Sequence, residues 1–247
     1  MKVSIITVVY NNKETIDDTI KSILNQSYKN IEYIIIDGNS NDGTCEIIKS
    51  YGDKITKFIS EPDKGIYDAM NKGLSLAIGD VIGILNADDF YVNNNVISKI
   101  VAAFDQTHCD AVYSDLIYVD QFNISKQIRK WKTGKYKPGS FLNGWMPPHP
   151  TFFVRREVYE EHGLFNTLLR SAADYEIMLR FIHKHKIKLG YIPEVLVKMR
   201  AGGVSNVSLK NRLRANKEDR MAWQINGLKP YFFTTWLKPL RKISQFI

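Results

Sequence analysis

The sequence predicts an α/β protein built on a mostly parallel, Rossmann-like sheet flanked by helices. Over the first hundred residues, β-branched runs alternate with helical apolar stripes in the order strand, helix, strand. The composition is that of an ordinary globular chain of 247 residues, 44% hydrophobic and 24% charged. It excludes the disordered and low-complexity classes. Strand–helix alternation of this kind gives parallel sheets with right-handed crossovers.

The first half of the chain supplies four predicted strands and three predicted helices. The run from Val3 to Val9 is almost entirely apolar and β-branched, as expected for a strand buried on both faces of a parallel sheet. Apolar residues from Ile66 to Ile78 recur at helical spacing. The predicted strands are 3–9, 31–36, 55–59 and 81–85, and the predicted helices lie at 16–24, 44–51 and 66–78.

After residue 110 the elements become shorter, and no linker separates them from the first half. We expect short strands at 111–113, 116–119, 126–131 and 151–154, and a helix at 173–183. The sequence is therefore interpreted as one continuous domain over 1–205, with halves 1–110 and 111–205, followed by a helical extension over 206–247.

The formal charge of +8 lies in the extension. Residues 1–199 carry 24 basic and 24 acidic side chains, whereas residues 200–247 carry 10 and 2. A nucleic-acid-binding domain would carry this excess itself, so no nucleic-acid partner is expected.

Basic residues beside an apolar stripe favour contact with an anionic membrane surface. Packing of a C-terminal helix on the domain, or on a second copy in a homodimer, is the alternative. The stripe comprises Phe232, Phe233, Trp236, Leu237, Leu240, Ile243 and Ile247, and Pro239 is expected to split it into two short helices.

Cys45 and Cys109 form neither a disulfide framework nor a zinc-binding spacing, and both are expected to be reduced. The N-terminal apolar run is too short for a signal peptide, and no apolar stretch is long enough for a membrane span. We therefore expect a cytoplasmic protein, peripheral on the inner face of the cell membrane if the extension binds lipid.

Acidic residues follow three of the four predicted strands, where ligands bind in open α/β sheets. They lie in Asp37-Gly38-Asn39-Ser40, in Glu61-Pro62-Asp63, and in Asn86-Ala87-Asp88-Asp89. The sequence contains no phosphate-binding glycine loop after the first strand and no Walker lysine motif, which argues against Rossmann dehydrogenases and P-loop NTPases. Carboxylates without such a loop indicate that Mn²⁺ or Mg²⁺ bridges the protein to a diphosphate.

Four motifs in this order resemble the inverting nucleotide-sugar glycosyltransferases of family 2, which have the GT-A fold. The resemblance covers about residues 2–205. The motifs are Ser4-Ile5-Ile6-Thr7-Val8-Val9-Tyr10-Asn11, Glu32-Tyr33-Ile34-Ile35-Ile36-Asp37-Gly38-Asn39-Ser40-Asn41-Asp42-Gly43-Thr44, Glu61-Pro62-Asp63-Lys64-Gly65-Ile66-Tyr67-Asp68-Ala69-Met70-Asn71-Lys72-Gly73, and Leu85-Asn86-Ala87-Asp88-Asp89.

The resemblance implies that 1–110 binds a nucleotide-sugar donor, most simply a UDP-sugar. Asp37 would accept a hydrogen bond from the base, although its Asp-Gly-Asn-Ser context also suits a plain turn. Asp88 matches the last acid of the D-x-D motif that holds the metal. Asn86 replaces the first acid, and Asp89 either assists or caps a helix beginning near Val92. The implied donor-binding residues are Thr7, Tyr10, Asn11, Asp37, Asn39, Asp63, Asn71, Asp88 and Arg200.

The resemblance also implies that 111–205 binds a saccharide or lipid-linked saccharide acceptor. Asp174 in Ala173-Asp174-Tyr175-Glu176 matches the general base, with Glu176 as the competing base and His149 on the acceptor side. Residues 200–205 resemble a loop that closes over the donor, where Arg200 or Arg170 would reach phosphate oxygens.

Two other functions compete with this one. A sugar-nucleotide nucleotidyltransferase of related fold would need a glycine-rich basic N-terminal loop, which Thr7 to Asn12 lacks. A non-enzymatic membrane- or nucleic-acid-binding module would use the basic end alone, and it would leave the acidic strand ends unexplained.

Overall fold

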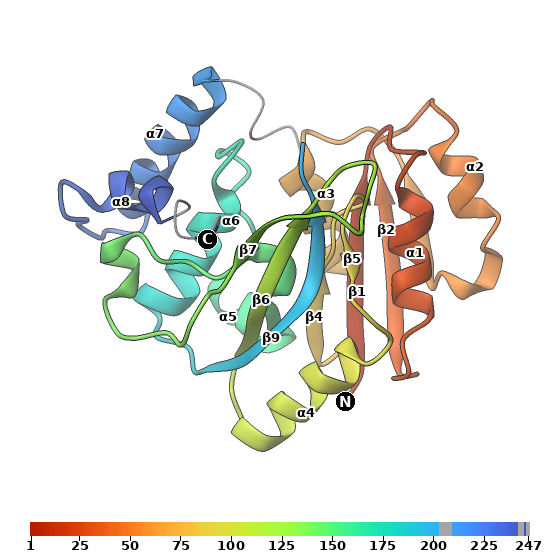
Figure 1. The fold of residues 1–247 in the computed structure, drawn as a ribbon, viewed down its shortest axis with the longest axis horizontal. Coiled ribbons are helices and arrows are strands. Elements are labelled where there is room, and N and C mark those ends of the chain that lie inside the picture. The colour runs from red at the N-terminus through yellow and green to blue at the C-terminus, as the bar shows by residue number, and fades with distance from the viewer. Residues whose placement is uncertain (203–208, 242–244, 246–247) are drawn as a thin grey trace.

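A computed structural model describes residues 1–202, 209–241 and 245, and its described strands form one mixed sheet of nine strands (Figure 1). The spatial order is β3-β2-β1-β4-β8-β6-β9-β5, with β7 pairing to β6 outside that path. The strands are β1 Val3–Val9, β2 Ile31–Asp37, β3 Lys57–Ser60, β4 Val81–Ile84, β5 Phe90–Tyr91, β6 Ala111–Val119, β7 Gln127–Trp131, β8 Phe153–Arg155 and β9 Leu189–Arg200.

The four strands β1 to β4 are parallel to one another, as the sequence predicts. Beyond β4 the sheet changes, because β8 pairs antiparallel with both β4 and β6, while β6 and β9 pair in parallel. The sheet is therefore mixed: the first half is parallel, as expected, and the second half combines the long parallel pairing of β6 and β9 with short antiparallel pairings. The carboxyl ends of β1 to β4 share one edge of the sheet, and the candidate site lies there.

Helices cover both faces of the sheet (Figure 1). The helices are α1 Ile16–Leu24, α2 Thr44–Lys49, α3 Ile66–Leu76, α4 Val96–Thr107, α5 Arg156–His162, α6 Ala173–Met178, α7 Leu209–Ile225 and α8 Thr234–Leu240. The short turns are η1 Gly52–Lys54, η2 Ser140–Asn143, η3 His149–Thr151 and the π-helical η4 Leu179–Lys184. One core lies under α1 and α4, and the other lies under α3, α5, α6 and α7.

Several element boundaries differ from the sequence-based expectations. The expected strands 111–113 and 116–119 are one strand, β6, and the expected helix 173–183 is α6 followed by η4. The twelve-residue β9 was not predicted, because Pro193 and a half-exposed pattern hide its strand character. Helix α8 runs through Pro239 instead of ending before it.

The C-terminal extension packs on the second half of the domain. Trp223 of α7 is completely buried, and its indole N–H donates to the Tyr175 hydroxyl of α6 at 2.9 Å. In α8, Thr234 donates its hydroxyl proton to the Leu142 carbonyl at 2.7 Å. Packing of the extension on the domain, the alternative expectation, thus describes α7 and α8. Ile243 and Ile247 of the expected stripe lie outside the described residues.

Candidate active site

The loops after β1 and β2 are joined by hydrogen bonds that fix one side of the site. The Asn11 amide donates to Ser40 Oγ at 2.7 Å, and the Asn41 amide donates to Asn11 Oδ1 at 2.9 Å. Asn11 and Asn39 have positive φ angles of 47° and 66°, a conformation that asparagine tolerates better than most residues. Two asparagines therefore turn these loops sharply at the edge of the sheet.

Asp37, the last residue of β2, is fully buried and shapes its own loop. Its carboxylate accepts hydrogen bonds from the Ser40 amide at 2.9 Å, the Ser60 hydroxyl at 2.6 Å and the Cys45 thiol at 3.1 Å. Burial alone would raise the pKa of Asp37, but the hydrogen bonds from Ser40 and Ser60 outweigh it and hold the pKa below its usual value. The turn-forming interpretation of Asp37 matches these contacts.

Tyr10 and Asp63 approach each other across Gly38. A β-carbon at position 38 would lie 2.5 Å from Asp63 Oδ2 and 3.3 Å from Tyr10 Cδ2, so only glycine fits without displacement. Asp63 Oδ1 accepts a hydrogen bond from the Gly65 amide at 2.8 Å, which orients the carboxylate. The Tyr10 ring is 64% exposed. This aromatic ring beside a fixed carboxylate is suited to a flat, polar base.

Thr7 does not present its side chain at the edge of the sheet, contrary to the expectation. Its hydroxyl is fully buried and accepts a hydrogen bond from the Tyr33 hydroxyl at 3.2 Å. The reason is strand geometry: Thr7 points to the same face as Ile5 and Val9, whose side chains lie in the core under α1.

The segment after β4 contains buried oxygens without hydrogen-bond partners. Both carboxylate oxygens of Asp89, and Oδ1 of Asn86, are buried and have no hydrogen-bond partner among the described residues. Burial and the nearby Asp88 carboxylate hold the pKa of Asp89 well above its usual value. Burial also raises the pKa of the half-buried Asp88. Orphaned hard oxygens beside a second carboxylate fit a bound divalent cation.

The loops after β1 and β4 are held together by Thr15. Its hydroxyl lies 2.9 Å from the Ala87 carbonyl and 2.7 Å from Asn12 Oδ1. The acidic segment is thereby fixed beside the nucleotide-side loops. The capping role considered for Asp89 is wrong, because α4 begins at Val96 and its N-cap is Asn95.

Arg200 lies beside the acidic segment at the end of β9. Its guanidinium donates to the Asp88 carbonyl at 2.8 Å and forms an ion pair with Asp18 of α1. The side chain is buried and lies over the Phe90 ring at 4.9 Å. Arg200 is therefore built into the wall of the site, and residues 203–205 of the expected closing loop lie outside the described residues.

Asp174 lies in the first turn of α6, where the N-terminal helix dipole favours a carboxylate. The Tyr67 hydroxyl of α3 donates to Asp174 Oδ1 at 3.2 Å. The Phe165 ring stacks on Tyr67 at 5.7 Å and meets the His149 ring edge-on at 5.7 Å. Burial lowers the pKa of His149, and the Asp174 charge partly opposes this shift. The contacts of Tyr67 and Phe165 therefore connect His149 to Asp174, and the acceptor-side roles of both residues stay predictions.

Tyr67 and Phe165 are site residues that the sequence analysis did not select. Tyr67 belongs to the third motif, but the predicted apolar face of that helix begins at Ile66 and omits Tyr67. In the structure Tyr67 is buried, whereas Ile66 is 46% exposed. Phe165 lies in a segment without any pattern. Tyr118 is also near, since both the Asp89 and Asp174 carboxylates help to raise its pKa, after burial.

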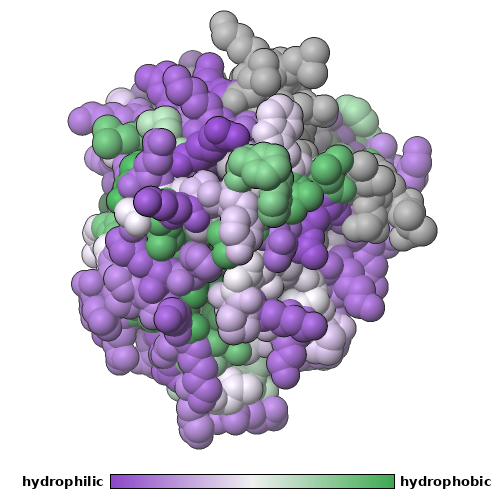
Figure 2. Space-filling view, turned by 90° about the vertical axis from the view of Figure 1, so that its left-hand side faces the viewer, coloured by the Kyte–Doolittle hydropathy of each residue, from purple (hydrophilic) through white to green (hydrophobic). Residues whose placement is uncertain are grey.

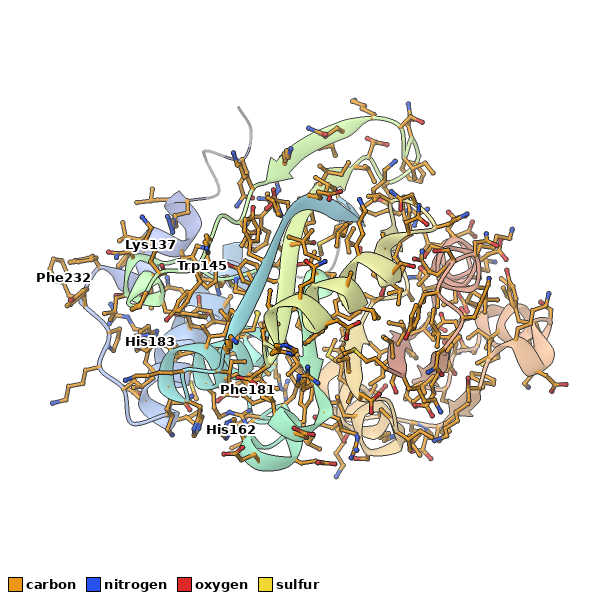
Figure 3. The ribbon with its side chains drawn as sticks, turned by 90° about the horizontal axis from the view of Figure 1, so that it is seen from below. Lys137, Trp145, His162, Phe181, His183 and Phe232 are labelled. Carbon is orange, nitrogen blue, oxygen red and sulfur yellow. The ribbon has the colours of Figure 1, made fainter. Side chains whose placement is uncertain are left out.

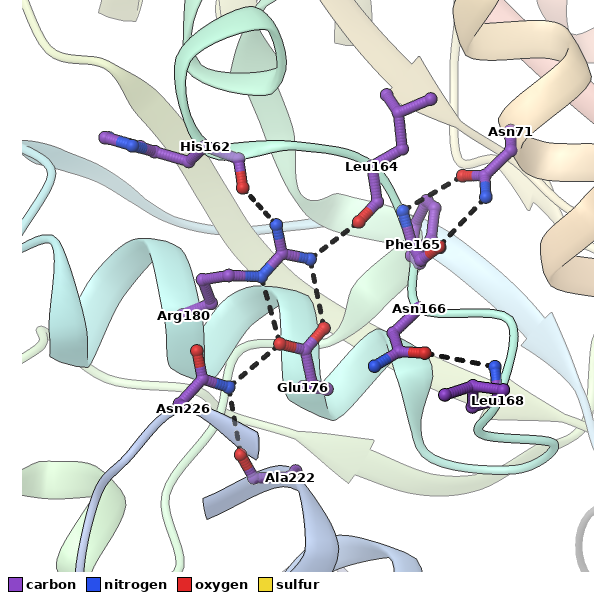
Figure 4. Close-up of polar contacts among 10 residues, drawn as sticks. All are labelled: Asn71, His162, Leu164, Phe165, Asn166, Leu168, Glu176, Arg180, Ala222 and Asn226. Atoms are coloured by element: carbon purple, nitrogen blue, oxygen red, sulfur yellow. Dashed lines mark hydrogen bonds and ion pairs between the residues drawn. The ribbon is translucent and has the colours of Figure 1, made fainter. Parts of the chain in front are cut away.

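Asn71 and Glu176 have structural partners instead of facing this space (Figure 4). The Asn71 amide donates to the Phe165 carbonyl and accepts from the Phe165 amide, both at 2.9 Å. It therefore pins the Phe165 loop instead of binding a nucleotide. Glu176 is buried, pairs with Arg180 at 2.9 Å and accepts from the Asn226 amide at 2.8 Å. These contacts leave Glu176 no role as a base.

Within residues 1–202, 209–241 and 245, no group of three or more His, Cys, Asp or Glu side chains is placed to hold a metal ion. A cation at Asp88 and Asp89 would take its other ligands from water and diphosphate, as Mg²⁺ commonly does. In the same part of the chain, no helix has the length and apolarity that crossing a bilayer requires.

The fold and the acidic strand ends define the GT-A class of glycosyltransferases. TarS from S. aureus in complex with UDP-GlcNAc matches with a TM-score of 0.70 at 16% identity, covering 92% of this chain and 65% of that one. The mannosyltransferase PcManGT from Pyrobaculum calidifontis, in complex with GDP-Man and Mn²⁺, matches with a TM-score of 0.67 at 18% identity, covering 98% and 73%.

The family model "Glycosyl transferase family 2" matches residues 4–163, and the chain belongs to this family. A PGL/p-HBAD biosynthesis glycosyltransferase of Mycobacterium bovis is 29% identical over 207 residues, 82% of this chain and 78% of the relative. The chain spans about two thirds of the first curated relatives and 42% of one TarS chain. Family membership disfavours the nucleotidyltransferase and the non-enzymatic module.

Proposed function

We propose that this chain is an inverting glycosyltransferase that moves a sugar from a UDP-sugar to a hydroxyl of a saccharide or lipid-linked saccharide. The observation that carries the proposal is the pair of acidic positions in this family 2 chain: the Asp88-Asp89 segment, with its buried unpartnered oxygens, and Asp174, held by the Tyr67 hydroxyl. One acidic position suits the donor diphosphate, and the other suits the acceptor. The UDP-GlcNAc complex of TarS supports a UDP-sugar as donor.

On the donor side, Tyr10 and Asp63 would flank the base, and the loops set by Asn11 and Asn39 would border the ribose. Asp88, assisted by Asp89, would hold Mn²⁺ or Mg²⁺, which offsets the negative charge of the departing diphosphate when bound. The Mn²⁺ complex of PcManGT supports this assignment. Arg200 fixes the Asp88 backbone through its 2.8 Å hydrogen bond and so positions this carboxylate.

On the acceptor side, Asp174 would take the proton of the attacking hydroxyl. One oxygen is held by Tyr67, which leaves Oδ2 for the acceptor. As the oxygen–carbon bond forms at the anomeric centre, the bond to the diphosphate breaks on the opposite face, and the proton passes to Asp174. A single displacement of this kind inverts the anomeric configuration. His149 and Phe165 would border the acceptor sugar.

The donor and metal assignment predicts ligand-dependent stabilisation. A UDP-sugar should raise the Tm of the full chain more with Mn²⁺ than without it, because only the folded state binds. A hundredfold excess over Kd corresponds to about 2.7 kcal/mol and several degrees. Asp88→Asn should lose the metal-dependent part, measured by differential scanning fluorimetry. Asp53→Asn, an exposed carboxylate in η1, is the matched control. No stabilisation by any UDP-, GDP- or dTDP-sugar would contradict the donor site.

The base assignment predicts a separation of binding from transfer. Asp174→Asn should lower kcat by about 10²- to 10⁴-fold, because an amide cannot take the proton. UDP-sugar binding should be unchanged by calorimetry, with Asp53→Asn again as control. Transfer within a few fold of the unmodified chain would reject Asp174 as the base.

A further inference from the structure

The C-terminal extension carries a cluster of exposed apolar side chains, here called the aromatic tip. It comprises Tyr231, Phe232, Trp236 and Leu240, which are 52%, 84%, 61% and 56% exposed. Figure 3 shows Phe232 projecting from one end of the molecule, and Figure 2 shows hydrophobic patches on the face that includes the C-terminal helices. Four large aromatic or aliphatic groups in one short segment exceed what scattered surface residues explain.

The helix that carries Trp236 and Leu240 of the aromatic tip is held by hydrogen bonds to neighbouring segments. In α8, the polar Thr234 and Thr235 are buried, with 1% and 2% of their surfaces exposed. Trp236 and Leu240 of the same helix face outward. Thr234 bonds to Leu142, and the Asn216 amide of α7 donates to the Thr235 carbonyl at 3.0 Å. The helix thus turns its polar residues inward and its apolar residues outward, which is the reverse of an ordinary surface helix.

The exposed charge of the C-terminal extension is basic. The two acidic residues of the extension, Glu218 and Asp219, are buried, with only 8% and 4% of their surfaces exposed. Glu218 accepts a hydrogen bond from the Ser171 amide, and Asp219 pairs with Lys238 at 2.7 Å. Exposed basic side chains are Arg214, Lys217, Arg220 and Lys229. Arg220 lies beside the tip, since its guanidinium donates to the Phe232 carbonyl at 3.4 Å.

We propose that the aromatic tip inserts into the interface of an anionic lipid bilayer, with Arg220 and the other exposed basic residues of the extension on the lipid headgroups. Tyr and Trp side chains favour this interface, and basic residues near it are attracted by anionic lipid. A twofold contact between copies would instead place one basic surface against another. Helix α7 packs on α6, which carries Asp174, so the docked face belongs to the acceptor-binding half. The inference does not depend on the proposed transfer reaction.

Vesicle co-sedimentation of the full chain without donor or acceptor tests the proposal. Binding should require phosphatidylglycerol mixed with phosphatidylcholine, and should weaken at high salt. The variant Tyr231→Ser/Phe232→Ser/Trp236→Ser should bind at least tenfold more weakly. Lys229→Gln should weaken binding about fivefold, the equivalent of one basic residue at an anionic surface.

Phe122→Ser is the matched control, because Phe122 is 91% exposed at the turn between β6 and β7, outside the extension. It should bind vesicles like the unmodified chain. Circular dichroism checks that each variant is folded. Equal binding to neutral vesicles, or equal binding by the triple variant, would overturn the proposal. A concentration-dependent dimer that the triple variant abolishes, without vesicle binding, would assign the aromatic tip to a second copy instead.

Discussion

At the scale of single residues, the site depends on side chains that hold other side chains. Tyr67 fixes one oxygen of Asp174, and Phe165 packs on Tyr67 while Asn71 holds the Phe165 backbone. None of these three residues has to touch a substrate to matter. They hold the Asp174 side chain in place, which its proposed role as general base would require.

Tyr67→Phe tests this positioning role. Loss of the hydrogen bond should lower kcat about tenfold, the equivalent of 1.4 kcal/mol, within the range for hydrogen bonds to charged groups. The KM for the donor should be unchanged. Steady-state kinetics with donor and acceptor varied in turn measures both constants.

Tyr113→Phe is the control for this substitution. It also removes a buried phenol hydrogen bond, here to the Gly134 carbonyl at 3.1 Å, but away from Asp174. Its kcat should stay close to that of the unmodified chain. An unchanged kcat in Tyr67→Phe would show that Tyr67 contributes packing alone.

At the scale of elements, α7 is part of the core of the second half. The fully buried Trp223 joins Tyr175 and the His183 ring, the latter at 5.2 Å. Asn226 at the end of the same helix bonds to Glu176 (Figure 4). The boundary predicted at residue 205 therefore divides the electrically neutral part of the chain from the basic extension. It does not divide two hydrophobic cores, because α7 shares the core of the second half.

Trp223→Ala should destabilise the chain by about 3–5 kcal/mol, because it removes a large side chain from a packed core. Trp236→Ala is a matched control in the same extension, where the side chain is 61% exposed. Its free energy of unfolding should change by about 0.5 kcal/mol or less. Chemical denaturation measures both. Similar, small effects of the two substitutions would show that α7 is an independent appendage.

At the scale of the whole molecule, burial explains why the expected strands and helices of the first half match and others do not. β1, β2 and β4 are buried on both faces, so their sequence is continuously apolar and visible. β9 is half-exposed, contains Pro193, and pairs with β6 across an irregularity at Asp115, so its residues carry no period of two. Periodicity marks a strand only where the environment on each face is uniform.

The same reasoning applies to the candidate site. Polar residues at the ends of buried strands predicted which edge of the sheet carries the candidate site. These residues include Asp37, Asp63, Asp88 and Asp89. Sequence could not show that Thr7 points into the core, or that the Asn71 and Glu176 side chains already have partners. These outcomes depend on which face a side chain points to and on residues distant in the chain, such as Phe165 and Asn226.

The sequence by itself determined the parallel first half, the acidic edge of its sheet and the location of the basic excess, because each is a local pattern of apolarity or charge. Only the tertiary structure decided which acids remain without partners, which residue orients Asp174, and which side of the extension faces outward. Those properties arise where α3, α6, α7 and the loop around Phe165 meet, and contacts between distant segments leave no periodic signal in the chain.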